Sequence, residues 1–170
     1  MAVGREGGLL SYSFIRAARF VLLASVSLPG VASSGVKRLV TTRTRALFGG
    51  DITLRTRIAP MANMNNPVPI EYVLVYDDTL LEMLIKTTAK DWFLMRNQLK
   101  QDFPEGFDSW YWEWVPGQAV EDQKLPLKPK ANAALVFANY VVPGDNRARL
   151  DPYKGVTINL GERNFTATQN

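Results

Sequence analysis

The pattern of apolar and polar positions predicts a protein made mostly of β-strands. Residues 52–59 alternate between apolar and polar side chains, which is typical of a strand with one face in water. Residues 70–76, apart from Glu71, and residues 133–142 are apolar on both faces, so we expect both to be central strands. Residues 109–115 are rich in Trp and Tyr, and this composition favours a fourth strand.

Three further strands are expected toward the end of the chain. Residues 123–127 form a short strand that contains Pro126. Because proline has no N–H for a sheet ladder, this strand should lie at an edge. Residues 155–160 and 163–168 are two more strand-like runs, joined by Gly161-Glu162, and they predict a closing hairpin.

Two helices are predicted between the second strand and the Trp-rich strand, at about residues 79–86 and 89–102. Thr79 precedes Glu82 by three residues, and Thr88 precedes Asp91 by three, which are capping-box spacings. Pro104 and Gly106 then end the second helix.

The resulting fold class is mostly β: an antiparallel β-sandwich of about seven strands with a helical insertion after the second strand. Residues 51–170 would form this domain. A parallel α/β fold is not expected, because helices do not alternate with strands.

The first fifty residues have a different composition. Residues 1–33 form a signal-like leader, with cationic groups before the apolar run Phe20–Ala32. That run has 13 residues, fewer than the roughly 20 that a membrane-spanning helix needs. Residues 34–50 are predicted to be a basic flexible linker, which could lie near anionic head groups or simply be solvated.

Composition narrows the function further. The chain contains no Cys and no His, so disulfides, thiolate nucleophiles, Cys/His zinc sites and Ser-His-Asp triads are excluded. The net charge of +4 is uneven, since residues 1–57 hold nine of the 20 basic groups and two of the 16 acidic groups. The folded part is therefore slightly acidic. We expect no enzyme, no cofactor, no metal and no nucleic-acid partner.

The order of elements resembles the TssJ family, small outer-membrane lipoproteins of the bacterial type VI secretion system. The stretches that carry the resemblance follow one another along the chain: the leader, 62–67, 69–76, Trp92-Phe93, 115–118, 135–140 with Arg147 and Arg149, and 155–160. Leu28-Pro29-Gly30 resembles the stretch before a lipoprotein cleavage site. The Cys that such a site requires is absent, which excludes acylation through a thioether.

The resemblance implies a transthyretin-like β-sandwich in the periplasm, associated with the outer membrane. It also implies a structural role in an envelope-spanning complex. The direct partner would be the periplasmic domain of a TssM-like protein. A TssL-like inner-membrane protein would take part indirectly, and the assembly would be a ring.

The partner contact in that family involves the loop between the first two strands. The matching residues here are Ala62, Asn63, Met64, Asn65 and Asn66. Met64 is the large apolar residue among them and would suit an interface anchor; the alternative is an ordinary solvated loop.

Secondary partner contacts are assigned to Arg147 and Arg149, for which a surface strand end is the alternative.

Three tryptophans admit a second function. Trp110, Trp112 and Trp114 alternate along one predicted strand and so share one of its faces. They could form a stacking platform for a glycan such as peptidoglycan, or they could pack beneath the predicted helices.

Overall fold

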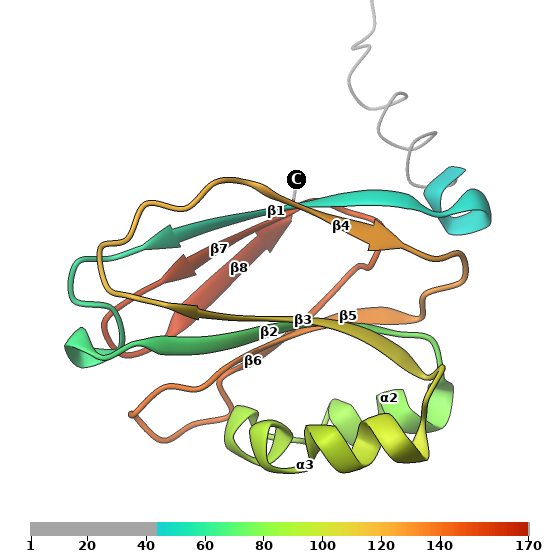
Figure 1. Ribbon diagram of the computed structural model, residues 1–170, viewed down its shortest axis with the longest axis horizontal. Coiled ribbons are helices and arrows are strands. Elements are labelled where there is room, and N and C mark those ends of the chain that lie inside the picture. The colour runs from blue at the N-terminus through green and yellow to red at the C-terminus, as the bar shows by residue number, and fades with distance from the viewer. Residues whose placement is uncertain (1–43, 170) are drawn as a thin grey trace, which may run out of the picture. The chain divides into compact units, whose positions relative to one another are not determined.

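Eight strands form two stacked four-stranded sheets within residues 44–169, the part of the chain that this computed structural model describes (Figure 1). One sheet has the order β4-β1-β7-β8, and the other has the order β3-β2-β5-β6. The strands are β1 (Gly50–Ile58), β2 (Val68–Val75), β3 (Phe107–Trp114), β4 (Gln123–Leu127), β5 (Ala133–Ala138), β6 (Arg147–Leu150), β7 (Val156–Leu160) and β8 (Phe165–Gln169). The predicted β-sandwich is thereby confirmed.

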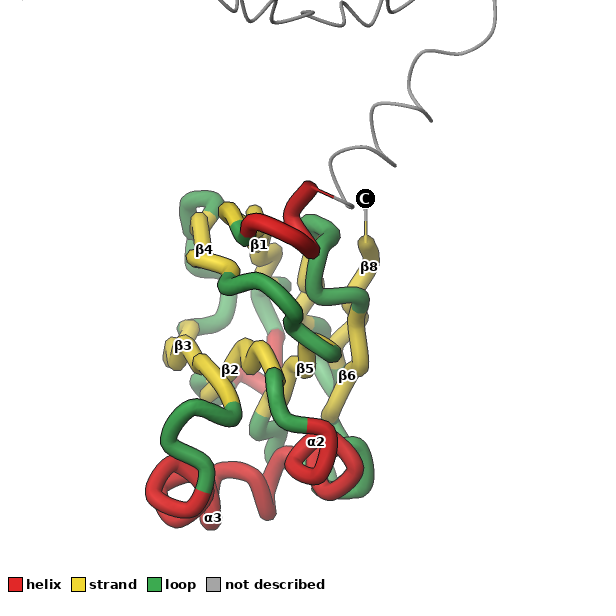
Figure 2. The backbone as a smooth tube through the Cα atoms, turned by 90° about the vertical axis from the view of Figure 1, so that its right-hand side faces the viewer, coloured by secondary structure: helices red, strands yellow, loops and turns green. Residues whose placement is uncertain are grey.

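Two helices add a third layer. Helices α2 (Asp78–Leu84) and α3 (Ala89–Asp102) lie between β2 and β3 in the chain and cover the outer face of the β3-β2-β5-β6 sheet (Figures 1 and 2). Strand β2 is buried on both faces because it lies between the two hydrophobic cores. Tyr72 points into the core between the sheets, and Val73 points into the core beneath the helices.

The helix starts follow the predicted capping chemistry in one case and differ in the other. Thr88 caps α3, and its hydroxyl oxygen accepts a hydrogen bond from the Asp91 N–H at 3.2 Å. Helix α2 instead begins one residue earlier than predicted. The Asp77 carboxylate accepts from the Leu80 N–H at 2.8 Å, so Asp77 takes the capping role that the spacing assigned to Thr79.

Three details of the sheets differ from the sequence expectation. Strand β5 ends at Ala138, four residues before the predicted end; the Asn139 N–H still donates to the Pro69 carbonyl of β2 at 2.8 Å, and Val141 and Val142 lie in the β5–β6 loop. Strand β6 was not predicted, because its four residues alternate charged and apolar side chains over too short a length. Strands β1 and β7 pair in parallel, although every other pairing in the described sheets is antiparallel.

The start of the described chain belongs to the sandwich. The leader and the linker up to residue 43 lie outside the described residues. Residues 44–48 form a helical turn, and β1 begins at Gly50. The Arg45 guanidinium donates to the Tyr153 carbonyl at 3.2 Å, so this part of the predicted flexible linker is held against the body. None of the helices in residues 44–169 has the length and hydropathy to cross a bilayer.

Candidate functional site

The loop between β1 and β2 contains a left-handed turn. Asn63, Met64 and Asn65 have φ angles of 51°, 53° and 61°, within the short segment η1 (Ala62–Asn65). Asparagine tolerates this conformation comparatively well, but a methionine there carries about 1 kcal/mol of backbone strain. Such strain persists only where the surrounding structure fixes the backbone, and it is most common at functional sites.

Asn63 makes several of the hydrogen bonds that fix this turn, and the Met64 N–H donates a further one to the Glu162 carbonyl at 2.9 Å. The Asn63 side chain is buried, and its Nδ2 donates to the Pro67 carbonyl at 2.8 Å. Its Oδ1 accepts from the Val141 N–H at 2.7 Å. The backbone N–H of Asn63 donates to the Gly161 carbonyl at 3.1 Å. The turn is therefore bound to the β5–β6 and β7–β8 loops.

Four apolar side chains are exposed on the loops at this end of the sandwich. Met61 and Met64 are 53% and 47% exposed on the β1–β2 loop. Val141 is exposed on the β5–β6 loop, and Val115 is exposed directly after β3. A backbone hydrogen bond of 3.0 Å from Gly117 to Ala59 ties the Val115 turn to the β1–β2 loop. We call Met61, Met64, Val115 and Val141 the loop-end surface.

The five predicted contact residues divide into two groups. Met64, Asn65 and Asn66 are exposed, whereas Ala62 and Asn63 are buried. The buried pair therefore shapes the turn and cannot present side chains to a partner. Met61, Val115 and Val141 were not among the predicted contact residues. Met61 and Met64 together were a usable signal, because two large apolar residues in a loop rich in Asn and Pro are unusual.

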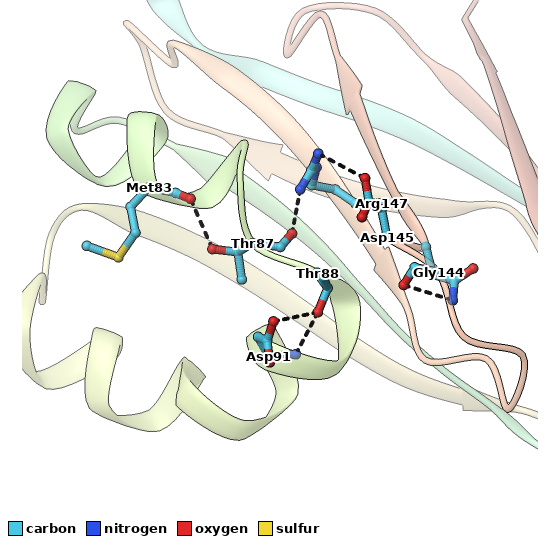
Figure 3. A network of polar contacts seen from close by, with 8 residues as sticks. Met83, Thr87, Thr88, Asp91, Gly144, Asp145 and Arg147 are labelled. Atoms are coloured by element: carbon cyan, nitrogen blue, oxygen red, sulfur yellow. Dashed lines mark hydrogen bonds and ion pairs between the residues drawn. The ribbon is translucent and has the colours of Figure 1, made fainter.

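Arg147 is used within the chain. Its guanidinium donates to the Thr87 carbonyl at 2.6 Å, and this bond joins β6 to the α2–α3 connection (Figure 3). The same guanidinium lies 3.8 Å from the Asp145 carboxylate. Arg149 is exposed on the same edge strand. Of the two predicted secondary contact residues, Arg147 makes contacts within the chain, whereas the Arg149 side chain is exposed.

The packing interpretation placed the Trp face of β3 beneath the helices. That placement is wrong, because the face points into the core between the two sheets. The reason is the register of β3 on β2. Trp110 is opposite Tyr72, and Tyr72 belongs to the face of β2 that lies between the sheets. Trp112 and Trp114 stack on each other at 6.2 Å between ring centroids. Those mutually stacked faces are not available to a sugar ring.

The helix-facing side of the same sheet holds a buried charged network. The Glu71 carboxylate in β2 is buried and accepts from the Trp92 indole N–H at 2.9 Å and from the Arg96 guanidinium at 2.6 Å. Tyr111 and Phe93 flank Arg96, with its Cζ 4.7 and 5.1 Å from their ring centroids. All of these groups are paired with one another, which is typical of a structural network. Among residues 44–169, no group of three acidic side chains is placed to hold a metal ion.

Tyr140 supplies a pH-dependent contact at the loop end. Burial raises the pKa of its hydroxyl to about 12, and that hydroxyl donates to the Gly161 carbonyl at 3.2 Å. Because the folded-state pKa lies above the unfolded value near 10, this contribution to stability is complete below about pH 10. It is lost as the pH rises to about 12.

We therefore expect the free energy of unfolding to fall between about pH 10 and pH 12. The Tyr140→Phe variant should show a shallower fall. Some fall should remain, because burial also raises the pKa of Tyr76 to about 12. Denaturant unfolding followed by circular dichroism across this range measures the effect. A Tyr140→Phe profile as steep as that of the original chain would contradict it.

Comparison of the sequence with protein-family models and with curated proteins gives no match. Comparison of the structure with solved structures, in contrast, gives several matches. Lip of Serratia marcescens, described as a membrane-bound component of the type VI secretion system, aligns with a TM-score of 0.55 at 17% identity, over 72% of this chain and 98% of Lip.

Two further solved structures are similar. The type VI lipoprotein TssJ1 from Pseudomonas aeruginosa aligns with a TM-score of 0.53 at 14% identity, over 72% of this chain and 97% of TssJ1. A chain of a type VI membrane complex aligns with a TM-score of 0.50 at 15% identity, over 72% of this chain and 98% of that one. The chain thus has the β-sandwich fold of the type VI secretion lipoproteins TssJ and Lip.

Proposed function

We propose that this chain is a structural, non-catalytic component of a type VI secretion membrane complex at the periplasmic side of the outer membrane. It binds the periplasmic domain of a TssM-like protein through the loop-end surface. The fold supports this assignment, because the sandwich aligns with almost the full length of the TssJ and Lip chains. At 14–17% identity the likeness concerns the fold alone. Support for partner binding therefore comes from the geometry of the β1–β2 loop.

The strained, exposed Met64 is the observation that carries the proposal. A flexible apolar side chain normally loses conformational freedom on binding, and a mobile loop loses more. Here the backbone is already fixed by the Asn63 side chain and by the bond from the Met64 N–H to the Glu162 carbonyl, so binding would order little beyond the Met64 side chain. Methionine is also adaptable in shape and polarisable, which suits a small apolar anchor at an interface.

Wider assembly follows from the same partner. A TssL-like inner-membrane protein would join indirectly through the TssM-like domain, and several copies would form a ring. Arg149 is the better candidate for a secondary ionic contact, because Arg147 already serves the α2–α3 connection.

Met64→Gly tests the contact without damaging the fold. Glycine adopts a left-handed backbone readily, so the free energy of unfolding should change by less than about 1 kcal/mol. Loss of the side chain should weaken binding to a purified TssM-like periplasmic domain about tenfold. Isothermal titration calorimetry measures the affinity, and thermal unfolding measures the stability.

Leu94→Ser provides the matched control. Leu94 is 77% exposed on α3, in the helical layer and outside the loop-end surface. This variant should bind the partner as the original chain does. If Met64→Gly also binds with unchanged affinity, Met64 is not the anchor and the proposed contact is wrong.

A further inference from the structure

The outer edge of β3 is long and open. Strand β3 has eight residues and is the first strand of its sheet, so within residues 44–169 it pairs with β2 alone. The other three edge strands have only four or five residues, and β4 also contains Pro126, which limits pairing. Strand β3 contains no proline and no lysine, the residues that most often protect an edge. An edge of this length is a template for a further strand.

The register of β3 indicates which of its backbone groups face the open edge. In an antiparallel pair, facing residues alternate between those that exchange hydrogen bonds and those that do not. The register continues past β2 to Tyr76 and Gly106, and the Tyr76 N–H donates to the Gly106 carbonyl at 2.8 Å. Counting in steps of two from Gly106, the even-numbered residues of β3 bond to β2. Ser109, Tyr111 and Glu113 therefore direct their N–H and carbonyl groups to the open edge.

Helix α3 runs alongside this edge. The Phe93 ring lies 6.1 Å from the Tyr111 ring, and further along the helix the Lys100 ammonium donates to the Phe107 carbonyl at 3.3 Å. Figure 2 shows α3 below the β3 side of the sheet. A hollow of about 240 Å³ lies between the helix and the strand, with Glu71 at its base. We call the other lining residues the edge groove: Arg96, Asn97, Lys100, Phe107, Ser109 and Tyr111.

Hydrogen-bond donors predominate in the edge groove. The Arg96 guanidinium and the Lys100 ammonium have several N–H donors each and no acceptor. In the described chain, Arg96 donates to Glu71, and Lys100 donates to the Phe107 carbonyl. Their remaining N–H groups can bind an occupant. The hollow is lined by two cations against one carboxylate, and that carboxylate is only 5% exposed.

The carboxylates outside the groove have partners of their own or lie beyond its ends. Asp108 pairs with Lys128 at 2.9 Å, on the opposite face of β3. Asp102 accepts from a glutamine on α3 at 2.8 Å. Glu105 and Glu113 are exposed on either side of the groove along the chain. An added strand is therefore favoured if it places a carboxylate midway, beside the two cations, and is disfavoured if it places carboxylates at both ends.

We propose that the edge groove binds an extended acidic segment of a partner protein, which adds to β3 as a fifth strand of the sheet. In such strand addition, backbone hydrogen bonds supply affinity and alternate side chains supply specificity. The backbone groups of Ser109, Tyr111 and Glu113 would bond the segment, and an Asp or Glu side chain of the segment would face Arg96 and Lys100. An apolar side chain two residues further along would cover the Tyr111 ring, which is 45% exposed. The residues of the loop-end surface do not line this groove, so the inference is independent of the proposed TssM-like partner.

A library of random peptides displayed on phage supplies the probes. The full chain is the bait, and peptides that bind the support alone are removed. We expect the enriched peptides to carry a central Asp or Glu with an apolar residue two positions away. The most enriched peptide is then synthesised with a fluorophore, and fluorescence anisotropy measures its affinity for the chain and for each variant.

Two lysines on the same helix provide a matched comparison. Lys100→Gln should weaken binding of the synthetic peptide about fivefold, because it removes an ionic contact. Lys90 is exposed at the start of α3 and does not line the groove, so Lys90→Gln should leave the affinity unchanged. Raising the salt concentration should weaken binding to the original chain.

Amide hydrogen exchange tests strand addition directly. With the peptide bound, the amides of Ser109, Tyr111 and Glu113 should exchange more slowly, whereas those of Trp110 and Trp112 should change little because they already bond to β2. Methylating alternate backbone nitrogens of the peptide should abolish binding for one alternating set and spare it for the other, since only one side of an added strand faces β3.

Four results would overturn the proposal: no peptide is enriched, the enriched peptides are basic, Lys90→Gln weakens binding as much as Lys100→Gln does, or both methylated sets bind alike. Slow exchange at Ser109 and Tyr111 that appears with rising protein concentration and without peptide would also overturn it, because the edge would then pair with a second copy of the chain. The Met64→Gly measurement leaves the edge groove intact, so failure of this inference is distinguishable from failure of the proposed function.

Discussion

Replacing Trp92 with alanine lowers the free energy of unfolding by about 4 kcal/mol. Trp92 is fully buried beneath α3. Its ring stacks on Phe137 at 4.9 Å and meets Phe107 edge-on at 5.5 Å, while its N–H donates to Glu71. Alanine would leave a cavity between helix and sheet and would leave Glu71 with one donor fewer. Denaturant unfolding followed by circular dichroism measures the loss.

Two variants separate the parts of this effect. Trp92→Phe keeps much of the packing and removes the indole N–H, so it should cost about 1–3 kcal/mol. Leu94→Ala, two residues further along the same helix and largely exposed, should change stability by less than about 0.5 kcal/mol. Comparable losses for Trp92→Ala and Leu94→Ala would show that α3 does not contribute to the core as described.

The periodic elements were predictable because burial repeats along them. Strand β1 buries Ile52 and Leu54 in the alternation expected from the sequence, and Pro126 lies in an edge strand as its missing N–H requires. Helix α3 buries Trp92 and Leu99 on one stripe. In each case the local pattern and the tertiary environment demand the same residues.

Elements that depend on long-range pairing were not predictable. Strand β6 has four residues and is defined by its partner β5, so its own sequence carries too little periodicity. The direction of the Trp face depends on whether Trp110 pairs with Tyr72 or with its neighbour, because a shift of one residue reverses both faces. Glu71 appeared to be an exception in an apolar strand, and its partners come from α3, more than twenty residues away.

The loop end was located from the resemblance, but the roles of its residues were not. Asn63 and Asn65 are alike in sequence context, yet Asn63 is buried and Asn65 is exposed. The difference arises from the β5–β6 loop, which supplies the Val141 N–H to Asn63. A partner of that kind, 78 residues away in the chain, leaves no local signal.

This difference between the two asparagines gives the second large effect. Asn63→Ala should lower the free energy of unfolding by about 3 kcal/mol. Loss of the side chain removes two buried hydrogen bonds, to Val141 and Pro67, at about 1 kcal/mol each. Placing alanine in a left-handed conformation adds about 1 kcal/mol. Asn65→Ala has the same backbone strain, but no side-chain hydrogen bond is lost, so it should cost only about 1 kcal/mol. Thermal and denaturant unfolding of the two variants provide a matched comparison.

The same pair connects stability to partner binding. Asn63 is buried and cannot touch a partner, yet Asn63→Ala should weaken binding to a TssM-like domain about tenfold, because the released turn would have to be ordered again on binding. Met64→Gly should weaken binding with little change in stability, and Asn63→Ala should reduce both. If Asn63→Ala loses stability and retains full affinity, the turn does not need to be held in advance. The strained backbone at Met64 would then serve the fold alone.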